Sequence, residues 1–402
     1  MWMSLLDRTA RRLIQTGHLQ ITYPNGETRS YGSGGGPTAA FEIRTNSRMR
    51  TLCLNPELAL GEGYMDETIV LKGVDELENL MRLLLRNMRP DGFSMYVRSL
   101  SKIRFYARAW LQRNTAHSAK SNVAHHYDLS DDLYGLMLDD DMQYSCGYFC
   151  RPDMTLEDAQ RAKKHHIAQK LMIERGCEIL DIGCGWGGMA MTLAKDYGAR
   201  VTGITLSENQ LVKARSRAEE AGLSDRIQFH LIDYRALDQQ FDRIVSVGMF
   251  EHVGVPHYTD YFSTISKLLK PDGIALIHSI GRVSSPRPHS PWIHKYIFPG
   301  GYTPSLSEML PALEASGLWQ SDIEVWRLHY ALTLREWRRR FLNNLDTIKE
   351  WYDDTFIRMW SYYLTACIMS FEEQQQVVYQ LQLAHKRDTV PLTRDYIYRD
   401  PI

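Results

Sequence analysis

The sequence lacks the features that mark disulfide-bonded, zinc-binding and membrane-spanning proteins. Its 402 residues include six cysteines, which form no CxxC pair and no Cys/His array with zinc-ligand spacing. No run of about 18 uninterrupted apolar residues occurs. Residues 1–13 also lack the long apolar core of a secretion signal. We therefore expect no disulfide scaffold, no bound metal and no transmembrane helix, and we expect a cytoplasmic protein.

An excess of either charge is also missing. The 47 lysines and arginines are balanced by 48 aspartates and glutamates, which leaves a formal net charge of −1. This balance argues against a globally basic nucleic-acid-binding protein, so nucleic acid is not an expected partner. The length and the 44% of apolar residues predict two domains. We place the first, of mixed strands and helices, at 1–115 and the second at 116–402.

One local segment departs from this balance. Between Gly92 and Tyr127 there is no acidic residue, and residues 96–113 mix basic with aromatic side chains. Such a stretch is either an ordinary surface helix with solvated charges or a helix that docks on anionic phospholipid. The sequence alone does not separate these two interpretations.

From Asp128 onwards, helical and strand patterns alternate. Strands are expected at 178–182, 200–204, 227–232, 243–247 and 273–280. Capping boxes begin at Thr155 and Ser207, and helices are expected over 155–174, up to Tyr197, over 207–221 and over 258–269. Alternation of this kind predicts a parallel sheet wrapped by helices. After Pro304 the chain is rich in aromatic residues, and two or three further helices are expected there, forming a helical C-terminal extension.

A glycine-rich segment, Leu180–Gly188, joins the first of these strands to the next helix. Glycines at this point of a strand-loop-helix unit let the backbone approach a nucleotide closely. The spacing of Gly183, Gly185 and Gly188 also fits the dinucleotide pattern GxGxxG. A nucleotide-type ligand is therefore expected, and NAD must be weighed against other ligands.

The neighbouring residues favour S-adenosylmethionine (SAM) over NAD. An NAD site requires an acidic residue at the end of the second strand, where this chain has Thr205-Leu206-Ser207. Asp181 would also place a negative charge beside the pyrophosphate of NAD. SAM brings sulfonium and ammonium cations instead, and a carboxylate favours both.

Asp233 and Tyr234 follow the strand that ends at Ile232. In such a fold this position suits adenine recognition, because a carboxylate accepts from the amino group and an aromatic ring lies on the base. The competing interpretation is a loop aspartate that is satisfied by its own neighbours.

Several segments together resemble the cyclopropane-fatty-acyl-phospholipid synthase family. They are His126–Leu129, Met142–Phe149, Leu180–Gly188, Gly203–Ser207, Asp233–Arg235, Phe241–Gly254, Lys295–Gly300 and Tyr362–Cys367. Leu60–Asp66 is similar to the longer, phospholipid-acting members, whereas the shorter members that modify mycolic acids lack this N-terminal part.

The resemblance implies an α/β fold, a Rossmann-like sheet of a SAM-dependent methyltransferase. It implies transfer of a methylene group to the cis double bond of unsaturated phospholipid acyl chains. The alternative is a lipid C-methyltransferase that leaves a methyl or methylene branch. The implied partners are membrane phospholipid, contacted peripherally from the inner face through 1–115 and the 96–113 segment, and a second copy of the chain in a homodimer.

The resemblance also implies two sets of site residues. The SAM contacts would be Tyr144, Ser145, Asp181, Gly183, Gly185, Gly187, Gly188, Thr205, Leu206, Ser207, Gln210, Asp233 and Tyr234. A bicarbonate ion at the reacting centre would be held by Cys146, Glu251, His278, the backbone of Ile280, and Tyr330.

The residue chemistry gives Glu251 a role but leaves its form open. Attack of an alkene on a methyl cation donor leaves a carbocation, and ring closure requires a base near the transferred carbon. Glu251 could take that proton directly or accept a proton from bound HCO₃⁻. On local sequence alone, Glu251 and His278 are more often structural, and Cys146 is more often a small buried residue.

Overall fold

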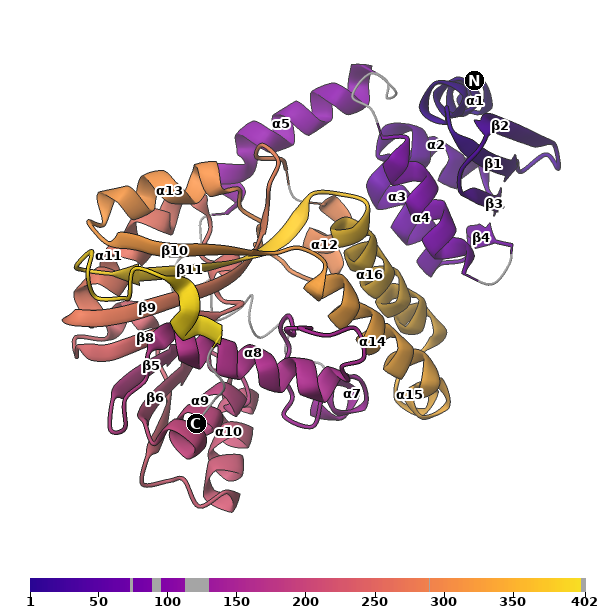
Figure 1. The fold of residues 1–402 in the computed structure, drawn as a ribbon. Coiled ribbons are helices and arrows are strands. Elements are labelled where there is room, and N and C mark those ends of the chain that lie inside the picture. Colours follow the sequence, from indigo (N-terminus) through magenta and orange to yellow (C-terminus); the bar gives the residue numbers. More distant parts are fainter. Residues whose placement is uncertain (73–74, 89–94, 113–129, 289, 399–402) are drawn as a thin grey trace. The chain divides into compact units, whose positions relative to one another are not determined.

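The computed structural model describes residues 1–72, 75–88, 95–112, 130–288 and 290–398 (Figure 1). They form two compact units. The smaller contains Met1–Arg108, Arg287–Pro299 and Trp337–Gln375, and the larger contains Ala109–Pro286, Gly300–Glu336 and Gln376–Ile402. The predicted boundary at residue 115 lies outside the described residues, so that division stays a prediction. No helix within the described ranges is long and apolar enough to cross a bilayer.

The larger unit is built on a seven-stranded sheet with the order β10-β11-β9-β8-β5-β6-β7. β5 to β9 pair in parallel, and β11 runs antiparallel to both β9 and β10. The strands span Glu178–Ile182 (β5), Arg200–Thr205 (β6), Ile227–Leu231 (β7), Phe241–Val247 (β8), Leu269–Arg282 (β9), Trp319–Trp326 (β10) and Gln376–Ala384 (β11). The chain leaves β5 in one direction to β6 and returns on its other side to β8, and such a switch point places a ligand at the carboxyl ends of the strands.

Helices cover both faces of this sheet. α8 (Leu156–Leu171), α9 (Gly188–Tyr197) and α10 (Glu208–Glu220) pack on one face, and α11 (Tyr258–Leu268) and α13 (Leu306–Ala315) pack on the other. Thr155 and Ser207 cap α8 and α10 by accepting from the backbone of Asp158 and Gln210. The predicted strands and helices of this region are thereby confirmed, with ends shifted by a few residues.

The C-terminal region adds two strands that the sequence analysis did not predict, β10 and β11, which complete the sheet. After Pro304 the described chain forms four α-helices, where two or three were expected: α13, α14 (His329–Asn343), α15 (Leu345–Trp351) and α16 (Asp354–Glu372). β11 is almost wholly buried, yet Tyr379–Leu383 alternates apolar with polar residues, which is a strand signal that the sequence analysis missed. β10 contains a shorter alternating run, Asp322–Val325, which was missed as well.

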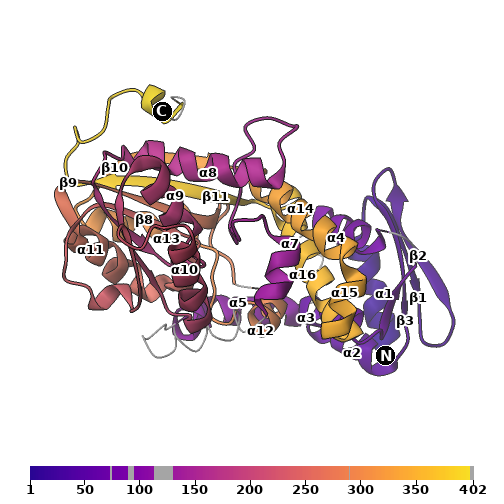
Figure 2. The ribbon, with the colours of Figure 1, turned by 90° about the horizontal axis from the view of Figure 1, so that it is seen from below.

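The smaller unit has its own sheet and core. Its strands follow the order β2-β1-β3-β4 and span Gly17–Thr22 (β1), Thr28–Gly34 (β2), Thr38–Ile43 (β3) and Ile69–Leu71 (β4). Its helices include α1 (Trp2–Leu13), α2 (Asn46–Leu54), α3 (Pro56–Met65), α4 (Glu76–Arg86), α12 (Pro291–Tyr296), α15 and α16. α16 packs on α3 and α4, as both views show (Figures 1 and 2). A long helix, α5 (Met95–Leu111), follows α4 in the chain.

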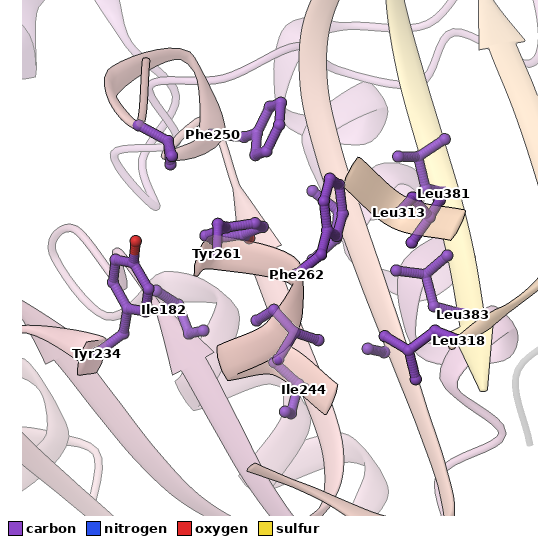
Figure 3. Packing of buried hydrophobic residues seen from close by; sticks show 14 of the residues in the cluster. Ile182, Tyr234, Ile244, Phe250, Tyr261, Phe262, Leu313, Leu318, Leu381 and Leu383 are labelled. Atoms are coloured by element: carbon purple, nitrogen blue, oxygen red, sulfur yellow. The ribbon is translucent and has the colours of Figure 1, made fainter. Parts of the chain in front are cut away.

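One hydrophobic cluster packs on the face of the sheet that α11 and α13 cover. Phe262 and Leu313, from α11 and α13, point toward Leu381 and Leu383 on β11 (Figure 3). Consecutive residues of β8 point to opposite faces of the sheet. Ile244 lies in this cluster, and Val245 lies in the cluster under α8, α9 and α10. The C-terminal strand is therefore part of the main core.

Truncation of a core leucine on β11 tests this arrangement. Leu381→Ala removes a fully buried side chain, and we expect a loss of about 2–5 kcal/mol in the free energy of unfolding of the larger unit. Urea unfolding followed by circular dichroism measures it. The matched control is Leu392→Ala, because Leu392 is fully exposed and its truncation should cost less than about 0.5 kcal/mol. Equal effects of the two substitutions would contradict the assignment of β11 to the core.

Candidate functional site

The loop between β5 and α9 is an open backbone cradle. Gly183, Gly185 and Gly187 adopt φ angles of +80°, +54° and +84°, a region that side-chain-bearing residues rarely enter. A Cβ atom added at Gly185 would meet nothing within 4 Å, so the space beside it is free. The amides of Gly183 and Cys184 donate to the Ile204 carbonyl at 2.9 and 3.0 Å, which fastens the loop to β6.

Asp181 ends β5 beside this loop. Its side chain is buried, and Oδ2 has no hydrogen-bond partner among the described residues. Burial raises the pKa of Asp181 to about 7, against the opposing effect of the Lys163 charge. A buried carboxylate oxygen without a partner is unfavourable unless a ligand supplies one. The cradle and the carboxylate therefore fit a cationic nucleotide-like ligand such as SAM.

A segment that we call the strap, residues Gln143–Cys146, crosses the start of α9. A Cβ atom at Gly188 would lie 2.3 Å from Nε2 of Gln143, so a larger residue there would displace this side chain of the strap. The Tyr144 ring packs edge-on against Tyr134, with ring centroids 5.1 Å apart. The strap brings Tyr144 and Ser145, two predicted SAM contacts, to the glycine-rich loop.

Two side chains of α8 hold the strap in place by hydrogen bonds. The Gln160 amide donates to the carbonyls of Ser145 and Gln143 at 2.8 and 3.2 Å. The Lys163 ammonium donates to Ser145 Oγ at 2.7 Å and to Gln143 Oε1 at 2.6 Å. The sequence prediction did not include Gln160 and Lys163, because the sequence predicts a helix over 155–174 but not which of its polar side chains are buried. The available signal was a polar series at helical spacing, Gln160, Lys163 and Lys170, beside the apolar positions.

The predicted contacts after β6 hold one another. Thr205 Oγ1 donates to Gln210 Oε1 at 3.0 Å and accepts from the Ser207 amide at 3.2 Å, and Ser207 Oγ accepts from the Gln210 amide at 3.3 Å. Leu206 is half-buried between them. These bonds give the turn a fixed shape at the carboxyl end of β6. Their contact with SAM stays a prediction.

Asp233 and Tyr234 are both engaged within the protein. Arg235 donates to Asp233 Oδ1 at 2.8 Å and to Oδ2 at 2.6 Å. Burial would raise the pKa of Asp233, but the hydrogen bonds from Arg235 outweigh it and lower the pKa. Tyr234 belongs to the core and packs edge-on against Tyr261 at 5.4 Å. The structure thus has the self-satisfied loop aspartate that the sequence left as an alternative, and adenine recognition here stays a prediction.

Glu251 and Ile280 meet directly. Glu251 lies in a short 3₁₀ turn, Phe250–His252, after β8, and its Oε1 accepts from the Ile280 amide of β9 at 2.6 Å. Its Oε2 is buried without a hydrogen-bond partner in the part of the chain that the structure describes. Burial raises the pKa of Glu251 to about 7, although the Ile280 amide acts in the opposite direction. Glu251 is therefore a proton acceptor poised near neutral pH.

His278 precedes Ile280 by two residues on β9 and is buried. Burial, together with the positive charges of Lys163 and Lys170, holds the pKa of His278 well below its usual value, so the imidazole is neutral. The Gln380 amide nitrogen lies 3.1 Å from its Nδ1. With the amide in this orientation Nδ1 accepts, and Nε2 carries the proton as a donor.

Cys146 and Tyr330 are connected through the first turns of α14. The Gly147 amide donates to Thr333 Oγ1 at 2.9 Å, and Tyr330 lies in the same region of the helix, half-buried. Burial raises the pKa of the Cys146 thiol, which does not suit a thiolate nucleophile. The Trp326 ring contacts His278 at 5.1 Å and His329 at 5.5 Å. The Trp326 indole thus lies between β9, which carries His278, and α14, which carries Tyr330.

The strand order and the acidic residue before a glycine-rich loop define the class of a SAM-dependent methyltransferase, and the comparisons agree. Residues 114–381 match the family model described as mycolic acid cyclopropane synthetase, and residues 9–90 match a domain of unknown function (DUF7884). The chain belongs to the cyclopropane synthetase family. The resemblance seen in the sequence motifs is thereby confirmed.

Two relatives extend over most of the chain. The cyclopropane-fatty-acyl-phospholipid synthase of Escherichia coli K12 is 37% identical over 352 residues, which is 86% of this chain and 88% of that protein. The tuberculostearic acid methyltransferase UfaA1 of Mycobacterium tuberculosis is 33% identical over 403 residues, 94% of this chain and 90% of that protein. Both overlap the N-terminal region as well as the methyltransferase fold.

A solved relative contains a ligand of the expected kind. The mycolic acid cyclopropane synthase CmaA1, in complex with SAH and CTAB, is 34% identical, with a TM-score of 0.63 over 66% of this chain and 97% of that chain. The predicted fold class and the enzyme class, a SAM-dependent methyltransferase, are confirmed by these likenesses.

The pH dependence of SAM binding tests the role of Asp181. Because its pKa is about 7, the carboxyl is mostly protonated at pH 6 and half ionised at pH 7. Only the carboxylate attracts the cations of SAM, so we expect SAM affinity to rise about fivefold from pH 6 to pH 7, a range below the pKa of about 8 to which burial lowers Lys163. In the ligand-free protein the sign is opposite. The folded protein keeps this proton up to a pH of about 7, whereas the unfolded chain loses it near pH 4, so stability falls as pH rises from about 4 to about 7.

Isothermal titration calorimetry with Asp181→Asn provides the comparison. The variant should bind SAM weakly and without this pH dependence. Glu251→Gln is the matched control, because Glu251 has a similarly raised pKa but lies outside the predicted SAM contacts, and it should keep the pH dependence. A wild-type affinity that does not change between pH 6 and pH 7 would exclude Asp181 as the cation-binding group.

Proposed function

We propose that the protein transfers a methylene group from SAM to the cis double bond of unsaturated phospholipid acyl chains and so forms cyclopropane fatty acids. The observation that carries this proposal is the unpartnered, buried Oε2 of Glu251, held beside the cofactor cradle at the carboxyl ends of adjacent strands. A simple methyl transfer to nitrogen or oxygen needs no base at a transferred carbon. The E. coli relative, which the chain matches over most of its length, carries this activity in its name.

The reaction sets three tasks for the protein. SAM supplies an electrophilic methyl group when bound. An alkene carbon forms a bond to that methyl carbon as its bond to sulfur breaks, and the neighbouring alkene carbon becomes cationic. A proton then leaves the transferred methyl group, and its bonding electrons close the three-membered ring. The site must hold the cofactor cation, exclude water and accept the proton.

We assign the first task to the predicted SAM contacts and the last to Glu251. In this proposal Asp181 faces the cofactor cations, and the glycines let the loop backbone approach the cofactor closely. The strap contributes Tyr144 and Ser145. One wall of the cofactor site is formed by Thr205, Leu206, Ser207 and Gln210, and the adenine lies toward Asp233 and Tyr234. Supporting this set, the unpartnered oxygen of Asp181 and the open space at Gly185 lie at the same strand end.

Bicarbonate is the proposed immediate base. Glu251 would accept the proton of HCO₃⁻ at Oε2, while His278 Nε2 and Tyr330 donate to its remaining oxygens and Cys146 lines the site. The neutral state of His278 and the raised pKa of Glu251 support this exchange. The Ile280 amide already donates to Glu251 Oε1, so the ion would share this donor with the carboxylate.

The substrate requires a membrane surface, and α5 offers one. Tyr96, Ile103 and Tyr106 are 57%, 63% and 79% exposed, and their spacing places them on one side of the helix. Lys102 is exposed beside Tyr106, and Arg98 is exposed farther round the helix. Arg113, the end of the predicted segment, lies outside the described residues. An apolar face edged by cations suits peripheral binding to anionic phospholipid on the inner leaflet. The same proposal includes two further points. The N-terminal region 1–115 associates with lipid, and two copies of the chain form a homodimer.

Product analysis tests the reaction. The purified full chain would be incubated with vesicles of unsaturated phospholipid and methyl-labelled SAM, with and without bicarbonate, and the fatty acids analysed by mass spectrometry. We expect a gain of one CH₂ with loss of the alkene, and a higher rate with bicarbonate. A methyl-branched or still-unsaturated product would replace the proposal with the C-methyltransferase function. Absence of labelled lipid despite SAM binding would reject phospholipid as the substrate.

Glu251→Gln separates the base from cofactor binding. Because the amide cannot take a proton, the variant should lose about 10²–10⁴-fold in rate while SAM affinity changes little. Unchanged turnover in the variant would contradict a role for Glu251 in proton removal.

Charge insertion on α5 tests the membrane surface. The double variant Ile103→Glu, Tyr106→Glu should reduce binding to vesicles that contain phosphatidylglycerol at least about tenfold, since it removes two apolar anchors and adds repulsion. Vesicle co-sedimentation measures the bound fraction. Val212→Glu is the matched control, because Val212 is 69% exposed on α10, outside the proposed surface. Equal binding of both variants would show that α5 does not dock.

A further inference from the structure

Lys163 is a buried charge whose partners are all neutral. Its side chain is fully buried on α8, and its ammonium bonds Gln143 Oε1 and Ser145 Oγ. Within the described ranges no carboxylate lies within ion-pair distance of it, whereas the adjacent Lys164 pairs with Asp141 at 2.5 Å. Burial of an ammonium without a counter-ion is unfavourable. A charge kept under these conditions points to an anion that arrives with a ligand.

The hydrogen bond to Ser145 has a fixed direction. A lysine ammonium carries donors only, so Ser145 Oγ must accept from it. The hydroxyl proton of Ser145 is therefore left for another acceptor, and no described group receives it. Gln160 fixes the backbone on both sides by its bonds to the Gln143 and Ser145 carbonyls. Lys163 thus turns Ser145 into an oriented donor with a positive charge 2.7 Å behind its oxygen.

The charges around the cradle match a zwitterion. The positive Lys163 acts electrostatically on Asp181, whose Oδ2 is buried and unpartnered. Of the other nearby carboxylates, Asp141 is already bound to Lys164 and Arg217, and Asp139 accepts from the Gln143 amide. One free negative oxygen and one oriented donor backed by a cation complement an amino acid, with its ammonium toward Asp181 and its carboxylate toward Ser145.

We propose that Lys163 is a positioning residue for the amino-acid carboxylate of SAM, acting through the Ser145 hydroxyl. This inference rests on the proposed SAM site and adds the determinant that distinguishes SAM from an analogue without the carboxylate. Charge-assisted hydrogen bonds to a carboxylate are among the stronger polar contacts in proteins, so the discrimination should be measurable.

The test compares SAM with decarboxylated SAM, which lacks only the carboxylate, by isothermal titration calorimetry on the full chain. The wild type should bind SAM more tightly than the analogue. Lys163→Met removes the charge at similar length, and we expect SAM affinity to fall about tenfold or more while affinity for the analogue changes less than about twofold. Ser145→Ala should reduce the same ratio, and it serves if Lys163→Met fails to fold by circular dichroism.

Lys164→Met is the matched control, since it removes an equal charge one residue away that does not bond Ser145. Its ratio of the two affinities should equal that of the wild type. An equal loss of both ligands in Lys163→Met and in Ser145→Ala would overturn the proposal and leave Lys163 as a support of the strap only. A wild type that binds neither ligand would instead reject the proposed SAM site itself.

Discussion

The site depends on two carboxyl groups that the fold keeps out of water without satisfying them. Asp181 and Glu251 each retain one buried oxygen that has no partner within the described structure. In a flexible loop such groups would turn toward solvent. Here Asp181 lies within β5 and Glu251 follows β8, and these two strands pair directly and are anchored in hydrophobic clusters on both faces of the sheet. Packing thus maintains two acceptors, one suited to a cation and the other to a proton.

The strap connects the proposed cofactor contacts to the proposed ion contacts. Ser145 belongs to the proposed cofactor contacts and Cys146 to the proposed ion contacts, and the two are consecutive in the chain. α8 holds this segment through Lys163 and Gln160, and α14 holds it through Thr333. Displacement of either helix would therefore disturb methyl donor and base together. Such coupling suits a reaction in which the carbon that receives the bond later loses the proton.

The central fold was predictable because its signals are local. Strand β5, the glycine-rich loop and the capping residues Thr155 and Ser207 are all marked by neighbouring residues, and the structure confirms them. β10 and β11 were not predicted, although each contains a short alternating run, Asp322–Val325 and Tyr379–Leu383, because the aromatic-rich region after Pro304 was interpreted as helical. The motifs identified Glu251, but its bond to the Ile280 amide depends on strand pairing, and the buried partners of Lys163 depend on tertiary packing. Arg235 also occupies Asp233, a contact that sequence spacing did not reveal.

The position of β11 has a consequence for the order in which the protein is completed. This strand lies between β9 and β10 and places Gln380 opposite His278, a separation of 102 residues. On the ribosome, β9 emerges early with one edge unpaired, and its backbone groups stay open to wrong partners until β11 has been synthesised. β11 therefore both completes this part of the sheet and positions the His278 imidazole. A nascent chain cannot acquire this arrangement before β11 has been translated.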